Sequence, residues 1–235
     1  MWRLLCASNV DSVSTPTGER LRDAAREIKP KLRGWLHLLA FPLSLVAGIT
    51  LVLLSEGERD KIATTVFAGS SSLLFGSSAL FHRGHWSPRW HGVLRRLDHS
   101  TIFLLIAGTY TPFALTLLHG ASARILLCLV WGGALLGIAF RVLWIGAPRW
   151  LYLPVYIALG WAAVFWLKDF ASAGPLVLGM IVLGGGLYSV GGLVYGLRWP
   201  NPVPRWFGFH EVFHSLTIAA FIAHYVGVSL VVYRA

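Results

Sequence analysis

The chain of 235 residues is 56% hydrophobic and only 13% charged. Soluble domains usually carry about a quarter charged residues, so this composition excludes an ordinary soluble protein. The uncharged stretches each approach the roughly 20 residues that a helix needs to cross a bilayer, and none shows the period-2 alternation of a membrane β-strand. A helical integral membrane protein is therefore predicted.

The predicted elements begin with a basic cytoplasmic tail over residues 1–33. Within it, residues 21–32 combine basic side chains with apolar ones at helical spacing, which is compatible with a short interfacial helix or with a solvated segment. Residues 34–235 form one transmembrane domain. Its seven predicted spans cover residues 34–54, 62–81, 101–118, 125–144, 150–167, 175–197 and 209–233. The expected fold class is an all-α, seven-helix transmembrane bundle.

The distribution of basic residues predicts the orientation of this bundle. Fifteen of the twenty Lys and Arg residues fall in the tail and in the loops or span ends on its side of the membrane. Cytoplasmic loops carry the excess of positive charge, so we expect the N-terminus in the cytoplasm and the C-terminus outside the cell membrane. Arg141, near the end of the fourth span, is expected to extend to the headgroups. An aromatic belt is predicted at the cytoplasmic ends, made of Trp35, Trp86, Trp90, Trp144, Trp150, Trp199 and Trp206.

The net charge of +10 does not indicate a nucleic-acid partner. The excess lies on the side that faces anionic lipid headgroups, so membrane lipids are the expected partners.

Two histidines four residues apart, His210 and His214, open the seventh span. Positions i and i+4 share one face of a helix, so both imidazoles can reach the same metal ion. The predicted topology places His82, at the end of the second span, on the same side of the membrane and at a similar depth. Because ionisable groups are costly in membrane segments, their coincidence favours a function. Three histidines with one open position are typical of a catalytic zinc site.

Two further polar residues are predicted to lie at this depth. Asp98 immediately precedes the third span, and Ser78 shares a helix face with His82. A carboxylate beside a catalytic zinc can accept a proton from water. We therefore predict that Asp98 orients the attacking water, and that Ser78 donates to Asp98, to a substrate carbonyl or to an oxyanion.

The remaining histidines are interpreted more simply. His99 neighbours Asp98 but points about 100° away, which leaves it at most a supporting role. His224 lies about 21 Å beyond His210 along the helix, too far to share an ion. Isolated histidines at helix ends are usually interfacial anchors, and this interpretation applies to His37, His85, His91 and His119.

The sixth span is rich in glycine, at Gly184, Gly185, Gly186, Gly191, Gly192 and Gly196. Small residues favour close packing between membrane helices. The alternative is a helix soft enough to open a lateral path for lipid.

Together, three motifs resemble the hemolysin III family, the bacterial branch of the progestin and adipoQ receptors, which include the adiponectin receptors. They are Ser78-Ala79-Leu80-Phe81-His82, then Leu97-Asp98-His99-Ser100 leading into Ala107-Gly108-Thr109-Tyr110-Thr111-Pro112-Phe113, and His210-Glu211-Val212-Phe213-His214. The resemblance covers about residues 30–235 and includes seven spans with a cytoplasmic N-terminus.

This resemblance implies a zinc ion bound by His82, His210 and His214. It also implies that Asp98 reaches the metal through water, with Ser78 nearby, and that the chain is related to membrane hydrolases that include alkaline ceramidases.

Three functions are compatible with these residues. A ceramidase-like, zinc-dependent hydrolase of lipid amide or ester bonds near the cytoplasmic face would use all five, and it is the preferred hypothesis. A non-enzymatic receptor-like or haemolysin-type membrane protein would use zinc as a structural ion. An intramembrane metalloprotease would use His210-Glu211-x-x-His214 with Glu211 as the general base, but it leaves His82 and Asp98 without a role.

Overall fold

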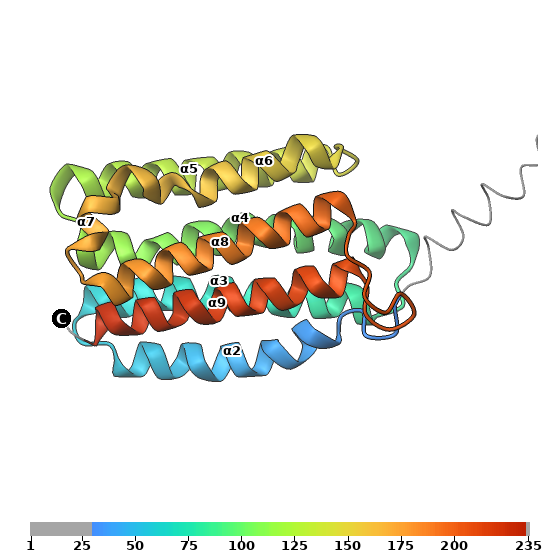
Figure 1. The fold of residues 1–235 in the computed structure, drawn as a ribbon, viewed down its shortest axis with the longest axis horizontal. Helices are drawn as coiled ribbons and strands as arrows, with labels where there is room; N and C mark the ends of the chain where they lie inside the picture. Colours follow the sequence, from blue (N-terminus) through green and yellow to red (C-terminus); the bar gives the residue numbers. More distant parts are fainter. Residues whose placement is uncertain (1–29, 234–235) are drawn as a thin grey trace, which may run out of the picture.

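The computed structural model describes residues 30–233, which form helices packed side by side along one long axis (Figure 1). The elements are α2 (Trp35–Leu54), α3 (Glu58–Arg83), α4 (Pro88–Leu117), α5 (Gly120–Leu143), α6 (Arg149–Gly160), the 3-10 turn η1 (Ala162–Trp166), α7 (Leu167–Ala171), α8 (Pro175–Leu197) and α9 (Phe209–Val232). Over residues 30–233, β-structure is limited to one isolated bridge between Val203 and Phe207. The predicted all-α fold is confirmed for this part of the chain.

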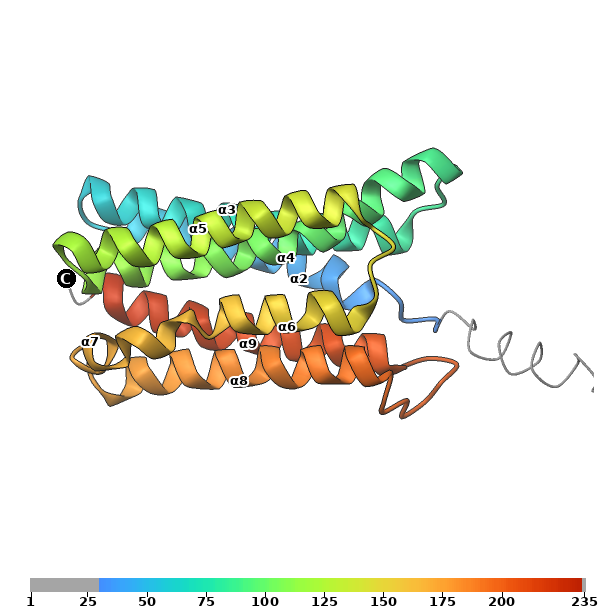
Figure 2. The same ribbon diagram turned by 90° about the horizontal axis from the view of Figure 1, so that it is seen from above.

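Consecutive helices are the main neighbours in the bundle. The closest pairings are α2 with α3, α3 with α4, α4 with α5, and α8 with α9, while α9 also packs on α2 and α4. The start of α2 and the end of α9 lie at opposite ends of the molecule (Figures 1 and 2). The packing of α9 on α2 brings the last described helix into contact with the first.

Within residues 30–233, six helices are long and apolar enough to cross a membrane, when α6, η1 and α7 are counted as one. Their outer faces carry large apolar side chains, of which Leu53, Leu136 and Phe165 are 75%, 75% and 79% exposed. Soluble monomers rarely expose continuous apolar surface of this kind. The chain is a multi-pass membrane protein.

The second predicted span, residues 62–81, corresponds to α3, which is as long as the others but more polar. Five serines contribute to this polarity. The hydroxyls of Ser70, Ser71 and Ser77 donate to carbonyl oxygens three residues earlier in the same helix, so they do not need water. The count of seven spans remains a prediction.

The fifth predicted span, residues 150–167, is broken rather than continuous. Helix α6 ends at Gly160, and the chain continues as the 3-10 turn η1 and then as the short helix α7. At the break, the hydroxyl of Tyr110 donates to the Gly160 carbonyl at 2.6 Å and accepts from the Ala163 N–H at 2.8 Å. Both backbone groups are thus satisfied inside the bundle, as an apolar environment requires.

Arg141 does not extend to the headgroups as expected. Its side chain is 1% exposed, and its guanidinium lies 4.2 Å from the centroid of the Tyr152 ring. The aromatic face attracts the cation, so the side chain is held inside the bundle instead of snorkelling.

Of the helix predicted at 21–32, residues 21–29 lie outside the described part of the chain. Residues 31–34 form a turn rather than a helix. The turn pairs with the loop that precedes α9, because the N–H groups of Lys31 and Leu32 donate to the carbonyls of Arg205 and Trp206 at 3.0 and 3.2 Å.

Replacing Tyr110 with phenylalanine should destabilise the fold. The change leaves two buried backbone groups at the helix break without their partner, so we expect a loss of about 1–3 kcal/mol in the free energy of unfolding in detergent. Tyr188→Phe is the matched control, since the Tyr188 hydroxyl is buried without a hydrogen-bond partner among residues 30–233. Equal stability of the two variants would contradict the role given to Tyr110.

Candidate metal centre

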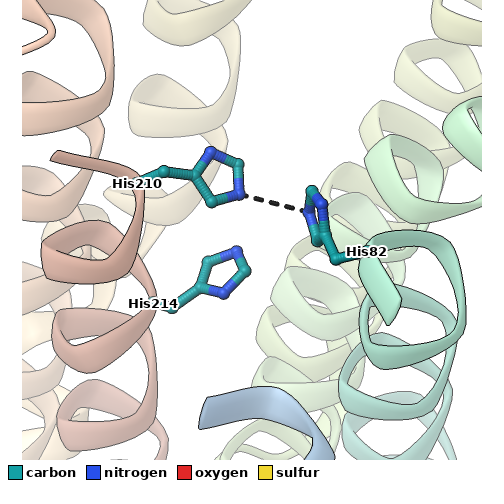
Figure 3. Close-up of side chains that lie close together, drawn as sticks. All are labelled: His82, His210 and His214. Carbon is teal, nitrogen blue, oxygen red and sulfur yellow. Dashed lines mark hydrogen bonds between the residues drawn. The ribbon is translucent and has the colours of Figure 1, made fainter. Parts of the chain in front are cut away.

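Three histidines from two helices converge at one end of the bundle. His82 lies in the last turn of α3, and His210 and His214 lie in the first turns of α9. One ring nitrogen from each lies within 4.8 Å of the others, and the Nε2 atoms of His82 and His210 are 3.1 Å apart. In Figure 3 the rings of His210 and His214 extend from α9 toward His82.

The donor set fits a zinc ion. Imidazole nitrogens bind zinc at about 2.0–2.1 Å, so two such ligands in a tetrahedral site lie about 3.3 Å apart. The His82–His210 separation is close to this value. His82 and His214 are buried and His210 is half-buried, so the three nitrogens lie in a position protected from bulk water.

Glu211 fixes the point where α9 begins. One carboxylate oxygen accepts from the Gly208 N–H at 2.8 Å, and the other pairs with Arg33 Nε at 2.5 Å. The side chain is 1% exposed, and it does not line the cavity at the histidines. A glutamate in the first turn also interacts favourably with the helix dipole. Glu211 therefore has a structural position, which weakens the metalloprotease interpretation of His210-Glu211-x-x-His214.

Asp98 lies beside the histidine cluster. Its Oδ2 is 3.9 Å from His82 Nε2 and 3.7 Å from His99 Nδ1, and the Ser78 hydroxyl hydrogen-bonds to the carboxylate. His99 Nδ1 donates to the Arg95 carbonyl at 2.8 Å. The carboxylate thus lies between Ser78 and the two histidines at the edge of the cluster.

His37 of α2 belongs to the site, although the sequence favoured an interfacial anchor. It is 2% exposed, and its ring stacks on His214 with centroids 3.7 Å apart and an interplanar angle of 7°. Neither ring nitrogen has a hydrogen-bond partner within the described chain. The anchor interpretation was wrong because burial of His37 results from packing of α2 on α9, which spacing within α2 cannot reveal.

A cavity of about 340 Å³ extends from the cluster into the bundle. Drug-sized ligands commonly occupy pockets of about 300–1,000 Å³. The cavity is lined by helices α4, α6, α8 and α9, and Ser78, His82, Asp98, His210 and His214 all contribute to its wall. The five residues predicted from the sequence therefore share one pocket.

Arginines line the same cavity near the cluster. They are Arg33, Arg95 and Arg149, of which Arg149 lies over the rings of Tyr195 and Phe209. The end of the cavity that holds the histidines is thus positively charged, while most of its wall is apolar.

The glycines of α8 allow close contacts, as one of the two interpretations predicts. A Cβ on Gly184 would collide with the ring of His224, and one on Gly185 would lie 3.8 Å from Trp161. Close packing therefore accounts for Gly184, whereas a Cβ on Gly185 would make only an ordinary contact, and a lateral path for lipid remains a prediction.

Comparison with known proteins gives consistent matches. The model of the family described as "Haemolysin-III related" matches residues 26–225. The chain is 34% identical over 186 residues to a "Hemolysin-3 homolog" of Bacillus subtilis (strain 168), covering 77% of this chain and 84% of that protein. It is 36% identical over 163 residues to "Hemolysin-3" of Bacillus cereus, covering 68% and 74%. It is also 29% identical over 230 residues to the "Adiponectin receptor protein" of Drosophila melanogaster, covering 85% of this chain and 50% of that protein.

The family match includes the three histidines, Asp98 and Ser78, and it agrees with the family that the sequence motifs predicted. The chain belongs to the haemolysin-III-related family of multi-pass membrane proteins.

Proposed function

We propose that the protein is a zinc-dependent hydrolase of lipid amide or ester bonds, such as that of ceramide. The observation that carries this proposal is that three histidines, a carboxylate and a hydroxyl meet at the charged end of an otherwise apolar cavity. A metal site used only to join helices does not need a cavity of ligand size beside it.

The three histidines would bind the ion, and the residues in contact with them would fix their positions. His82, His210 and His214 supply one neutral ring nitrogen each. A zinc ion held there would supply Lewis-acid chemistry, which would polarise a carbonyl group and lower the pKa of bound water toward neutrality. His37 keeps the ring of His214 in place by stacking on it, and Glu211 keeps the first turn of α9 in place.

Asp98 and Ser78 handle protons and the substrate carbonyl. Asp98 accepts the proton of the attacking water at its carboxylate, which the Ser78 hydroxyl orients. Ser78 also lines the cavity, so its hydroxyl can turn to donate to a carbonyl oxygen that gains negative charge. The acyl chain occupies the apolar wall, and the arginines at the charged end attract the polar part of the lipid.

We further propose that α3 is a transmembrane helix, which makes seven spans with the N-terminus in the cytoplasm and the C-terminus outside the cell membrane. Support comes from the position of α3 between α2 and α4 and from its length of 26 residues. The excess of Lys and Arg near the N-terminal end supports the orientation, and the exposed Trp35, Trp90, Trp150 and Trp206 fit an interfacial aromatic belt.

A second candidate is a non-enzymatic, receptor-like or haemolysin-type membrane protein with a structural zinc ion. One observation favours it: the candidate ligands come from the end of α3 and the start of α9, so an ion between them would fasten two helices. The two candidates differ in the role of the cavity. In the first it binds a substrate, whereas in the second the zinc ion only stabilises the bundle.

Metal analysis of the purified protein tests the site itself. We expect about one zinc per chain, and loss of zinc in His82→Ala and His214→Ala, because a catalytic zinc site keeps three protein ligands and each variant would leave only two. His119→Ala is the matched control, since His119 is exposed and caps the start of α5. Full zinc occupancy in both ligand variants would refute the assignment.

His37 should act through its stacking contact rather than through its nitrogens. We expect His37→Ala to weaken zinc affinity about 10-fold, as loss of a group that orients a ligand does. His37→Phe keeps a flat ring against His214 and should restore most of the affinity. Competition with a chromophoric chelator measures both values, and equal weakening in the two variants would indicate that a ring nitrogen is required.

Hydrolysis of ceramide and of other acyl lipids in micelles tests catalysis. Asp98→Asn should retain zinc and lower kcat by about 100-fold or more, because it removes the proton acceptor. Glu211→Gln should mainly reduce thermal stability, because it weakens the contact with Arg33, and should largely spare acyl-lipid hydrolysis, whereas the metalloprotease alternative requires it to abolish peptide hydrolysis. Wild-type protein that holds zinc and hydrolyses no acyl lipid would favour the structural-zinc candidate.

A further inference from the structure

The end of the cavity far from the three histidines holds two polar side chains that the proposed chemistry does not use. His224 of α9 and Tyr188 of α8 both line the cavity. Their rings are 5.6 Å apart, with an interplanar angle of 39°. His224 is 8% exposed, so this pair lies in the interior of the bundle.

The hydrogen bonding of His224 fixes its tautomer. Its Nε2 lies 3.3 Å from the carbonyl oxygen of Ile181, and a carbonyl can only accept, so Nε2 carries the hydrogen. The other nitrogen, Nδ1, is therefore an acceptor with a free lone pair. The hydroxyl of Tyr188, whose ring neighbours that of His224, can both donate and accept.

Neither atom is satisfied by the described part of the protein. Nδ1 of His224 and the Tyr188 hydroxyl are buried without a hydrogen-bond partner among residues 30–233. A buried polar group without a partner costs free energy, and native structures rarely contain two in contact. The pair therefore points to a ligand that supplies a group able to donate to Nδ1 and to pair with the hydroxyl.

The fold makes room for this pair. A Cβ on Gly184 would collide with the His224 ring, so the absence of a side chain at that position is what allows the ring to lie against α8. The ring also faces Phe113 of α4, with centroids 6.4 Å apart. His224 is thus held at the meeting point of three helices.

The distance between the two polar ends of the cavity matches one acyl chain. His214 and His224 are ten residues apart on α9, which corresponds to about 15 Å along the helix. One leaflet contributes half of a hydrocarbon core of about 30 Å, or about 15 Å. Apolar side chains line the cavity as well, among them Leu105, Ile106 and Ile157.

We propose that Tyr188 and His224 form a second polar subsite, which binds a hydroxyl group at the far end of a single acyl chain whose head lies at the three histidines. The subsite selects lipids by where their chain carries a hydroxyl. The inference rests on the proposed function only for the position of the head, because binding at the far end requires no turnover.

Binding of matched fatty acids to the purified full chain in micelles tests this subsite. For chain lengths from lauric to palmitic acid, each plain acid is compared with its ω-hydroxy derivative by calorimetry. One hydrogen bond of ordinary strength changes affinity by about 3- to 10-fold, and we expect that preference for the hydroxylated acid at one length. Tyr188→Phe and His224→Leu should lose the preference, and Tyr188→Phe should bind the plain acid as the wild type does.

Tyr225→Phe is the matched control. Tyr225 is next to His224 on α9, but its hydroxyl donates to the Ala47 carbonyl and it does not line the cavity, so the preference should persist. Asp98→Asn should also keep the preference while losing hydrolysis, which separates this proposal from the proposed reaction. Equal binding of both acids at every length, absence of binding of either acid, or a preference unchanged in Tyr188→Phe would overturn the subsite. If His224→Leu fails to fold, Tyr188→Phe decides the question.

Discussion

The contacts of Glu211 with Gly208 and Arg33 determine where α9 begins, and the site depends on that point. A helix turns by about 100° per residue, so a start shifted by one residue would rotate His210 and His214 away from His82. Arg33 in turn leads directly into α2, which carries His37 onto His214. The buried carboxylate of Glu211 thus fixes the position of the histidine pair on α9 and connects it to α2, the helix that carries His37.

Two arrangements recur among the polar groups inside this bundle. Where the fold itself requires them, they are paired locally: Tyr110 bridges the break after α6, and the serines of α3 bond to their own helix. Others face the cavity, where Asp98 borders one end and the Tyr188–His224 pair the other. The bundle itself supplies hydrogen-bond partners to many of its buried polar groups, and at the cavity wall a ligand can supply the partners that the Tyr188–His224 pair lacks.

Much of the fold and of the site follows from the sequence, because hydrophobic runs of sufficient length specify helices, and charge bias specifies which ends lie together. Those two rules were enough to bring His82 close to His210 across 128 positions. They could not identify His37, the burial of Arg141 or the break at Gly160. Each of these depends on which helix face meets which neighbour, and spacing within one segment carries no information about the partner.

The separation of the site between α3 and α9 has a consequence for biogenesis. While the ribosome is still producing α8, the histidine cluster is incomplete, because His210 and His214 have yet to be synthesised. The hydrogen bonds of Lys31 and Leu32, in the turn before α2, likewise cannot form until the loop that precedes α9 has been synthesised. A chain interrupted before α9 would carry neither the site nor the contact that joins its first helix to its last. Any ion is therefore acquired late, after the last helix has been inserted, and metal content should report completed insertion.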